Sequence, residues 1–401
     1  MYTPLKADFF AGNRKRLKKK LAEKLPIIIA GNGLLQRTSD NAYSFTQDSN
    51  FWYLTGIDIP DMVLVIDVHE TFVIVPDRSV SREAFDGKID ALALETRSGI
   101  TAVYNEADGW TKIKDAIKSS RNVSCMLPNP PYDKGHGMYV NPARKRAYDR
   151  LRRITGNTPI SDCRPSLAEL RAIKQPEEIE QIKQAVKITK ESLSCLNELL
   201  LGSTLTEGDL EARLSYEFRR RGSHGHAYQP IVAQGKNATT MHYVQNNAVV
   251  PKDTLVLIDA GAEIEHYAAD ITRVVCFGSP SRRQQSVINA VKSIQERIIS
   301  NMKPGIKLRD LEKKAEQFIG EELVKLGVIT DLGDKAQIRR FYPHAVSHFL
   351  GLDVHDVGDY NKPLRKGMVL TCEPGIYIPE EGIGVRLEDD ILITQNGPEI
   401  L

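Results

Sequence analysis

The second half of this chain contains two copies of one pattern, and this repeat restricts the fold more than any other feature. Residues 179–222 and residues 284–327 each read as a long helix, a glycine-containing turn and a second helix that ends at glycine. The tripeptides Ala-Val-Lys and Asp-Leu-Glu recur at corresponding places in both copies. Strand-like sequence follows each copy, and two copies are too few for a solenoid. We therefore predict an α+β domain built from a duplicated helix–helix–sheet unit, with a cleft where its halves meet.

The first half of the chain alternates between helix and strand patterns, as an α/β domain does. Residues 7–25 have the spacing of an amphipathic helix, and residues 26–32 form a short apolar run that predicts a buried strand. Two further strands are predicted at 62–68 and 71–77, joined by a tight connection. The alternation continues to about residue 160, so we predict an α/β N-terminal domain.

Two prolines mark a boundary between these halves. Pro165 and Pro176 flank a short helical piece, and Pro176 is followed by two glutamates, which favours a helix start. That helix is predicted to end at Gly202. We expect an N-terminal domain over residues 1–165 and a second domain over residues 173–401.

The composition excludes several classes of protein. The net charge is +2, so electrostatics gives no reason to expect nucleic acid or an anionic membrane as a partner. The basic run at 14–20 is interpreted as a solvated helix face. No apolar run approaches the roughly 20 residues of a membrane-spanning helix, and the N-terminus lacks the apolar segment of a signal peptide. The five cysteines are scattered without CxxC spacing, which predicts free thiols in a reducing compartment, the cytoplasm.

A predicted hairpin over residues 254–277 carries an aspartate at the inner end of each strand. If the hairpin is symmetric about Ile264 and Glu265, Asp259 and Asp270 lie directly opposite each other, with Cβ atoms roughly 5 Å apart. Two like charges in this arrangement repel, whereas a bound divalent cation would attract both. Turn formation or exposure to water is an equally good explanation from the hairpin alone.

Three histidines follow the second helix pair. His344, His348 and His355 fall within twelve positions, and His344 and His348 share a face even on an extended chain. Beyond them a predicted buried strand, Val369–Cys372, is followed directly by Glu373 and then by proline and glycine. A glutamate at the end of a buried strand needs a proton, a cation or a hydrogen-bond partner.

The last predicted strand, residues 382–394, carries further charged residues. Arg386, Glu388 and Asp390 alternate along it and share one face. An ion pair between Arg386 and Glu388 is the competing explanation for this glutamate.

Together these segments offer four carboxylates and one imidazole as candidate metal ligands: Asp259, Asp270, His348, Glu373 and Glu388. So many carboxylates cannot all ionise together without more than one positive charge nearby. Two divalent ions bridged by carboxylates would satisfy them. Oxygen-rich ligation with one histidine favours Mn²⁺, Co²⁺, Fe²⁺ or Zn²⁺, and the residue types do not select among these four metals.

Four motifs in this order resemble the pita-bread metallopeptidases, the family of methionine aminopeptidase, prolidase and aminopeptidase P. The motifs are DAGAEIEHYAADITR, SHFLGLDVHD, EPGIY and GVRLEDD, and the resemblance covers residues 176–401. YSFTQDSNFWYLTG at 43–56 is similar to the N-terminal domain of aminopeptidase P and prolidase, which methionine aminopeptidases lack. The resemblance implies an α/β N-terminal domain followed by a pita-bread catalytic domain.

The resemblance also implies a role for each ligand. Asp259 would chelate one metal ion, and Asp270 and Glu388 would bridge both. His348 and Glu373 would complete the second ion, and Glu373 would serve as general base for the bridging water.

Residues around the metal site have roles by the same resemblance. His242 and His355 would contact the scissile carbonyl and the developing oxyanion. His344, Tyr377 and Arg386 would shape the pocket for the proline after the cleaved bond.

These roles imply an aminopeptidase that removes the residue before a proline at the second position of a peptide. The Xaa–Pro bond is a tertiary amide, and a dinuclear site can bind the free amine, polarise the carbonyl and activate a water. One alternative is prolidase, which takes only Xaa–Pro dipeptides. A more distant one is a pita-bread binding protein without catalysis. The resemblance further implies a homo-oligomer, a dimer or a tetramer.

Overall fold

The computed structural model describes residues 3–201 and 204–401, and the chain forms two compact units. One unit comprises residues 4–170, and the other comprises residues 171–401 together with Thr3. The boundary between them falls inside helix α7 (Arg164–Ala172). Each unit has its own sheets and its own hydrophobic core.

A mixed six-stranded sheet forms the centre of the N-terminal unit. The strand order is β10-β7-β1-β4-β5-β6. Strand β4 runs antiparallel to β1 and β5, and the other neighbouring pairs are parallel. The strands are β1 (Ile27–Ala30), β4 (Val63–Ile66), β5 (Thr71–Ile74), β6 (Ala102–Tyr104), β7 (Val123–Cys125) and β10 (Ile160–Asp162), with the short ribbons β2 (Gln36–Thr38), β3 (Asn41–Ala42), β8 (Tyr132–Asp133) and β9 (Met138–Tyr139) outside the sheet.

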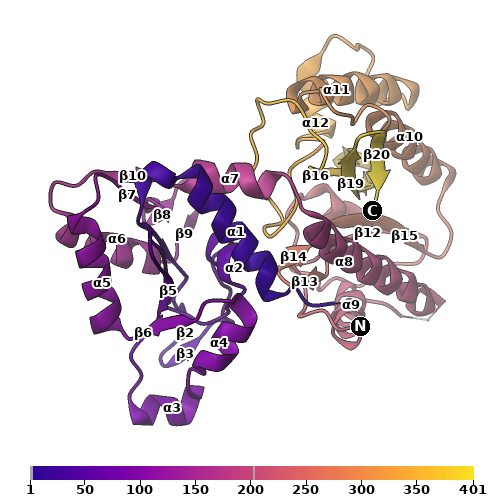
Figure 1. Cartoon of the computed structure of the whole chain (residues 1–401). Coiled ribbons are helices and arrows are strands. Elements are labelled where there is room, and N and C mark those ends of the chain that lie inside the picture. The colour runs from indigo at the N-terminus through magenta and orange to yellow at the C-terminus, as the bar shows by residue number, and fades with distance from the viewer. Residues whose placement is uncertain (1–2, 202–203) are drawn as a thin grey trace. The chain divides into compact units, whose positions relative to one another are not determined.

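Helices cover both faces of this sheet, which confirms the predicted α/β class of the first half. Figure 1 shows α1 and α2 on one side of the sheet and α5 and α6 on the other. Trp110 of α5 packs with Phe72 and Ile113 in the core beneath α5 and α6. The helices are α1 (Ala7–Lys20), η1 (Ala22–Lys24), α2 (Ser49–Thr55), α3 (Val80–Asp86), α4 (Ala91–Ser98), α5 (Glu106–Lys118) and α6 (Ala143–Thr155).

The C-terminal unit contains the two predicted copies of a helix pair followed by strands. In the first copy α8 and α9 precede β11, β12 and β15, and in the second α10 and α11 precede β16 and β19 (Figure 1). The duplication is therefore confirmed. The helices are α8 (Pro176–Cys195), η2 (Leu196–Leu201), α9 (Glu207–Arg220), η3 (Gly235–Thr239), α10 (Arg282–Ile299), α11 (Leu308–Lys325), α12 (Lys335–Phe341) and η4 (Pro379–Glu381).

Four small antiparallel sheets complete this unit. Two have three strands, in the orders β11-β12-β15 and β16-β19-β20, and two are the pairs β13-β14 and β17-β18. The strands are β11 (Ile231–Gln234), β12 (Thr254–Ala260), β13 (Glu263–Ile264), β14 (Tyr267–Ala268), β15 (Ile271–Phe277), β16 (Val369–Cys372), β17 (Gly375–Ile378), β18 (Ile383–Arg386), β19 (Asp389–Thr394) and β20 (Gly397–Ile400).

The hairpin β12–β15 folds in a different register from the predicted one, so the prediction of directly opposed aspartates is wrong. Asp259 lies opposite Thr272, because the turn is centred between Glu265 and His266. Both turn residues have positive φ, 49° and 59°, which the tight turn of a two-residue hairpin requires. A β-branched residue such as Ile264 adopts positive φ poorly, and it pairs with Tyr267 instead.

The shifted register still keeps the two aspartates close. Asp270 is two positions from Thr272, so it becomes a diagonal neighbour of Asp259 on the same side of the hairpin. Gly261 permits this arrangement, since a Cβ atom there would lie 1.7 Å from the carbonyl oxygen of Ala269.

Residues 382–394 form two strands rather than one, which is a second correction. Strand β18 pairs with β17 and β19 pairs with β16, so the chain changes sheets at Leu387 and Glu388. The Glu388 N–H donates to the carbonyl of Thr272 at 3.2 Å, which holds this break beside β15. Strand β20 then follows, so the segment is not the last strand. Because the chain changes sheets here, Glu388 belongs to neither strand, and its side chain points toward the β12–β15 hairpin.

Helix α8 ends at Cys195 and continues as the 3₁₀ turn η2, while the predicted stop, Gly202, lies outside the described residues. Within 3–201 and 204–401, no helix has both the length and the apolar character needed to cross a membrane.

Candidate metal centre

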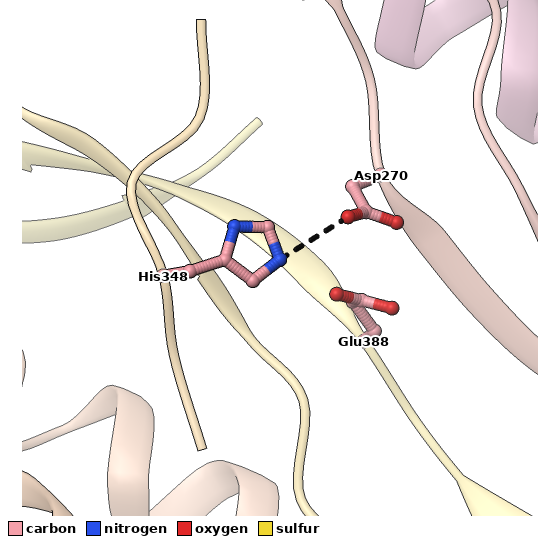
Figure 2. A group of neighbouring side chains, drawn as sticks. All are labelled: Asp270, His348 and Glu388. Carbon is pink, nitrogen blue, oxygen red and sulfur yellow. Dashed lines mark ion pairs between the residues drawn. The ribbon is translucent and has the colours of Figure 1, made fainter. Parts of the chain in front are cut away.

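Three side chains from distant parts of the C-terminal unit meet at one point. Asp270 precedes β15, His348 lies in the coil between α12 and β16, and Glu388 occupies the break between β18 and β19. One ligand atom from each lies within 4.8 Å of the other two. Figure 2 shows the three groups facing one another, with Nε2 of His348 3.3 Å from Oδ2 of Asp270. This spacing suits groups that share a cation.

The two other predicted ligands adjoin this trio. Oε1 of Glu373, at the end of β16, lies 3.4 Å from Nε2 of His348. Asp259, in β12, is linked to Asp270 through the hydroxyl of Tyr228. We call these five residues the metal-centre cluster: Asp259, Asp270, His348, Glu373 and Glu388. All five line one cavity of about 240 Å³.

The cluster contains more buried negative charge than the protein neutralises. Four carboxylates face two cationic groups, His348 and Arg386. Burial raises the pKa of Asp259 and of Glu388, and it raises the pKa of Glu373 to about 7. The excess of acid over base fits the binding of divalent cations, which would replace the protons that burial otherwise imposes.

Tyr228 gives independent evidence that the metal-centre cluster lacks positive charge. Its hydroxyl oxygen lies 2.5 Å from Oδ1 of Asp259 and 2.6 Å from Oδ1 of Asp270. A phenol has one proton to donate, so it satisfies only one of the two carboxylates. The other contact requires a proton on the aspartate or a cation that draws the three oxygens together. The donor set therefore fits a metal site.

His348 has the orientation of a metal ligand. Its Nδ1 lies 3.0 Å from the carbonyl oxygen of Phe349, to which it donates, and this fixes Nε2 toward the two carboxylates. Burial lowers the pKa of His348, but the hydrogen bond to Asp270 and the charge of Glu373 more than reverse this, and its pKa is about 9. Nε2 therefore carries a proton in the metal-free protein, in the place that a metal ion would take.

Hydroxyl groups orient two of the carboxylates, and sequence analysis did not identify them. Thr272 donates to Oε2 of Glu388 at 2.6 Å, and Thr371 donates to Oε1 of Glu373 at 3.1 Å. Thr371 and Glu373 are two positions apart, as are Thr272 and Asp270, so period-two alternation is the signal that was available. Tyr228 lies in irregular chain, where no periodicity points to it.

Asp390 also helps to hold the backbone of Asp270 in place. Its side chain is fully buried, and Oδ2 accepts the backbone N–H of Asp270 at 3.0 Å. Oδ1 has no hydrogen-bond partner among the described residues. Burial and the nearby charge of Asp270 raise the pKa of Asp390.

A second group of predicted residues forms one wall of the cavity. Nε2 of His344 lies 2.8 Å from the Tyr377 hydroxyl, and Nη1 of Arg386 donates to the same hydroxyl at 3.0 Å. Nη2 of Arg386 donates to Oδ2 of Asp259 at 2.5 Å, whereas its Nε lies 4.0 Å from Oε2 of Glu388. Arg386 therefore pairs with Asp259 first, and an Arg386–Glu388 pair does not account for the burial of Glu388.

The remaining predicted residues lie at the mouth of the cavity. His242 and His355 both line it and are exposed. The His355 ring packs edge-on against His348 with centroids 4.5 Å apart. The structure thus brings every predicted site residue to one cavity, with Tyr377 directly behind its lining.

Comparisons with known proteins agree with this architecture. A model of metallopeptidase family M24 matches residues 180–395, and a model of the aminopeptidase P N-terminal domain matches residues 10–124. Fold and site together define a metallopeptidase with an additional N-terminal domain. The chain belongs to metallopeptidase family M24.

Individual relatives match almost the whole chain. The Xaa-Pro aminopeptidase of Escherichia coli K12 is 32% identical, covering 98% of this chain and 93% of the relative. Human Xaa-Pro aminopeptidase 3 is also 32% identical, covering 94% of this chain and 77% of the relative. The structure of zinc-substituted E. coli aminopeptidase P in complex with product superimposes with a TM-score of 0.84 at 29% identity, covering 99% of this chain and 95% of that one.

Proposed function

We propose that this protein is a metal-dependent aminopeptidase that hydrolyses the bond between the first residue of a peptide and a proline at the second position. The observation that carries the proposal is one cavity lined by the metal-centre cluster together with His344 and Arg386, both of which are hydrogen-bonded to Tyr377 behind the lining. Relatives that match over both domains are named Xaa-Pro aminopeptidases. In the reaction, water adds across the amide, giving a carboxylate on the first residue and a free proline amine.

The metal-centre cluster would hold two divalent ions, with Mn²⁺ the expected metal and Co²⁺, Fe²⁺ and Zn²⁺ as alternatives. Asp270 and Glu388 would be shared between the ions, Asp259 would serve one, and His348 and Glu373 the other. When bound, the ions supply Lewis acidity to the scissile carbonyl and lower the pKa of the attacking water.

Glu373 is the proposed general base. It accepts a proton from the attacking water and passes it to the proline nitrogen as the C–N bond breaks. A general base works best when its pKa is close to the working pH, and burial raises the pKa of Glu373 to about 7 in the metal-free protein. The hydrogen bond from Thr371 keeps Oε1 of this carboxylate facing the cluster.

Three histidines around the metal-centre cluster, His242, His344 and His355, would contact the substrate. His242 and His355 reach the cavity from its mouth, where they would donate to the carbonyl oxygen as negative charge develops on it. Burial and the charge of Arg386 lower the pKa of His344 to about 3, so it is neutral. A neutral His344 places no charge against the proline, which has no N–H to satisfy. Tyr377 lies behind the cavity lining, with its hydroxyl 2.8 Å from Nε2 of His344, and would hold that ring in place.

Two other functions remain as competitors. Prolidase would use the same metal centre but accept only Xaa–Pro dipeptides. A binding protein without catalysis would tolerate loss of ligands, yet all five ligands of the proposed set are retained here.

The test measures hydrolysis of an Xaa-Pro-Xaa tripeptide and of an Xaa–Pro dipeptide with added Mn²⁺, together with metal content per chain. We expect turnover of the tripeptide, and we expect Asp270→Asn to lower kcat/KM by about 1,000-fold or more because it removes a shared ligand. Glu217→Gln is the matched control, since Glu217 is a buried carboxylate of α9 that pairs with arginines away from the cavity.

The outcomes separate the three functions. Turnover confined to the dipeptide would identify a prolidase. Full turnover in Asp270→Asn, or no metal in either protein, would contradict the proposed metal centre. A loss in Glu217→Gln as large as in Asp270→Asn would show that the assay reports only stability.

We also propose a homo-oligomeric, cytoplasmic protein. The five cysteines are free, which is compatible with a reducing compartment. Sedimentation analysis of the purified protein distinguishes a monomer from a dimer or a tetramer.

A further inference from the structure

A buried ion network lies beneath the loop that carries His355. Nη2 of Arg171 donates to Oδ1 of Asp356 at 2.5 Å and to Oδ2 of Asp353 at 2.8 Å. Nζ of Lys174 donates to Oδ2 of Asp356 at 2.9 Å. The side chains of Arg171, Lys174 and Asp356 are only 1–2% exposed. We call Arg171, Lys174, Asp353 and Asp356 the anchor network. It joins segments about 180 residues apart in the chain.

This network is balanced in charge and tightly packed. Burial raises the pKa of Asp356, but the charges of Lys174 and Arg171 more than offset this, so its pKa lies below the ordinary value. Gly351 closes over the carboxylate, since a Cβ atom at this position would lie 2.1 Å from Oδ2 of Asp356 and 2.9 Å from Cε of Lys174. A residue with a side chain at position 351 would therefore displace one of these two groups.

The basic side of the network is itself fixed. The Lys174 N–H donates to the carbonyl of Gly367 at 2.8 Å, and the N–H of Gln175 donates to Glu178 in the first turn of α8 at 2.9 Å. The segment from Arg171 to Gln175 is therefore held by the helix start and by the approach to β16. It provides a rigid point of attachment.

The acidic side of the network is adjacent to the cavity. Asp356 is buried, while the preceding residue, His355, is exposed and lines the cavity. The Asp356 N–H donates to the carbonyl of Phe349 at 2.9 Å, and the same carbonyl accepts from Nδ1 of His348 at 3.0 Å. One carbonyl thus connects Asp356 with the orientation of His348.

We propose that Arg171 and Lys174 are positioning residues, which hold Asp356 so that His355 faces the scissile carbonyl. They act through the Asp353–Asp356 loop, which carries His355. The inference rests on the proposed function, because it specifies how one residue of that site is placed. A purely structural role predicts instead that loss of the network would affect activity only through the amount of folded protein.

The experiment is a double-mutant cycle between the network and His355. Asp356→Asn is made in the wild-type protein and in His355→Ala, and steady-state kinetics are measured on an Xaa-Pro tripeptide at equal folded fraction and metal content. We expect Asp356→Asn to lower kcat about tenfold with KM changed less than about threefold, and to lower kcat less than about twofold in His355→Ala. Lys174→Met, which leaves Asp356 paired with Arg171, gives a milder version if Asp356→Asn does not fold.

A second measurement does not depend on turnover. The imidazole NMR signals of His355 are expected to shift in Asp356→Asn and in Lys174→Met, and to stay in place in Glu217→Gln. Equal losses of kcat in both backgrounds, or unmoved His355 signals in both network variants, would overturn the inference while the proposed function stands. A wild-type protein that does not cleave the tripeptide would contradict the proposed function, and the NMR result would still decide whether the network places His355.

Discussion

Two buried acidic clusters in the C-terminal unit differ in how their charge is satisfied. In the anchor network, Asp356 receives two cationic side chains and its pKa is lowered. In the metal-centre cluster, Arg386 and His348 are too few for the four carboxylates, and the pKa values of Asp259, Glu373 and Glu388 are raised. The side chains of Asp356 and of the four carboxylates in the metal-centre cluster are at most 15% exposed, so burial alone does not separate them.

The comparison shows that the balance of charge, rather than the presence of acids, identifies a cation site. A carboxylate that is already paired contributes to the fold and gains nothing from a metal ion. A carboxylate that remains unpaired makes the metal-free fold less stable, and that cost is recovered when a cation binds. The protein thus accepts a local loss of stability where the chemistry requires open ligands.

The largest expected effect is on stability. Removing a carboxylate from the anchor network should destabilise the protein, whereas removing one from the metal-centre cluster should stabilise its metal-free form. Asp356→Asn leaves a buried cation without its partner and should lower the free energy of unfolding by about 3–5 kcal/mol. Glu388→Gln removes a repelled carboxylate, whose pKa is raised by burial and by the neighbouring acids, and should raise the free energy of unfolding of the metal-free protein at pH 7. Urea unfolding with a chelator present measures both changes.

Glu217→Gln is the control for this comparison. Oε1 of Glu217 lies 2.8 Å from Nε of Arg213 and Oε2 lies 3.0 Å from Nε of Arg220, so it should destabilise the protein as Asp356→Asn does. Two destabilising results, for Glu388→Gln as well as Asp356→Asn, would contradict the distinction between the clusters.

A smaller effect is expected in the pH dependence of the metal-free protein. The folded-state pKa of Glu373 is about 7 and that of His348 about 9, both above their ordinary values. Each group binds its proton in the native state but not in the unfolded state between its ordinary and its folded-state pKa, from 4.5 to about 7 for Glu373 and from 6.5 to about 9 for His348. Within that window stability falls as pH rises, by up to about 1.4 kcal/mol per pH unit for each group. Asp356 has the opposite sign, because its lowered pKa gives stability that is lost only in acid.

Thermal unfolding from pH 5 to pH 8, with chelator and with Mn²⁺, checks this expectation. The melting temperature of the chelated protein should decrease across the range, and the stabilisation by Mn²⁺ should increase, since metal binding displaces protons. A stabilisation by Mn²⁺ that does not change with pH would exclude proton displacement at these ligands.

Sequence reasoning singled out several residues that line the cavity because their types conflict with their surroundings. Glu373 at the end of an apolar strand and three histidines in twelve positions required a cause that local structure does not supply. The order of helices and strands in the duplicated unit followed from periodicity and glycine positions. These patterns lie within short stretches of sequence, so they can be recognised without knowledge of tertiary contacts.

The hairpin register and the contacts between residues far apart in the chain were not predicted from the sequence. The turn at Glu265 and His266 moved the hairpin register, because a choice between adjacent turn centres depends on small backbone preferences. Tyr228 and the anchor network act across large separations, and Lys174 meets Asp356 over 182 residues. No periodicity connects such pairs, so only the folded chain reveals them.

The smallest expected effect tests whether burial matters to the comparison. Lys183 of α8 pairs with Glu399 of β20 at 2.7 Å, with side chains 40% and 45% exposed. Exposed pairs are screened by water and contribute about 0.2–1 kcal/mol, so Lys183→Ala should change the free energy of unfolding by less than about 1 kcal/mol and leave kcat/KM unchanged. Urea unfolding and tripeptide hydrolysis measure both. If Lys183→Ala instead lowered the free energy of unfolding as much as Asp356→Asn, ion pairing would stabilise this unit whether the pair is buried or exposed. The contrast between the two acidic clusters would then reflect pairing alone.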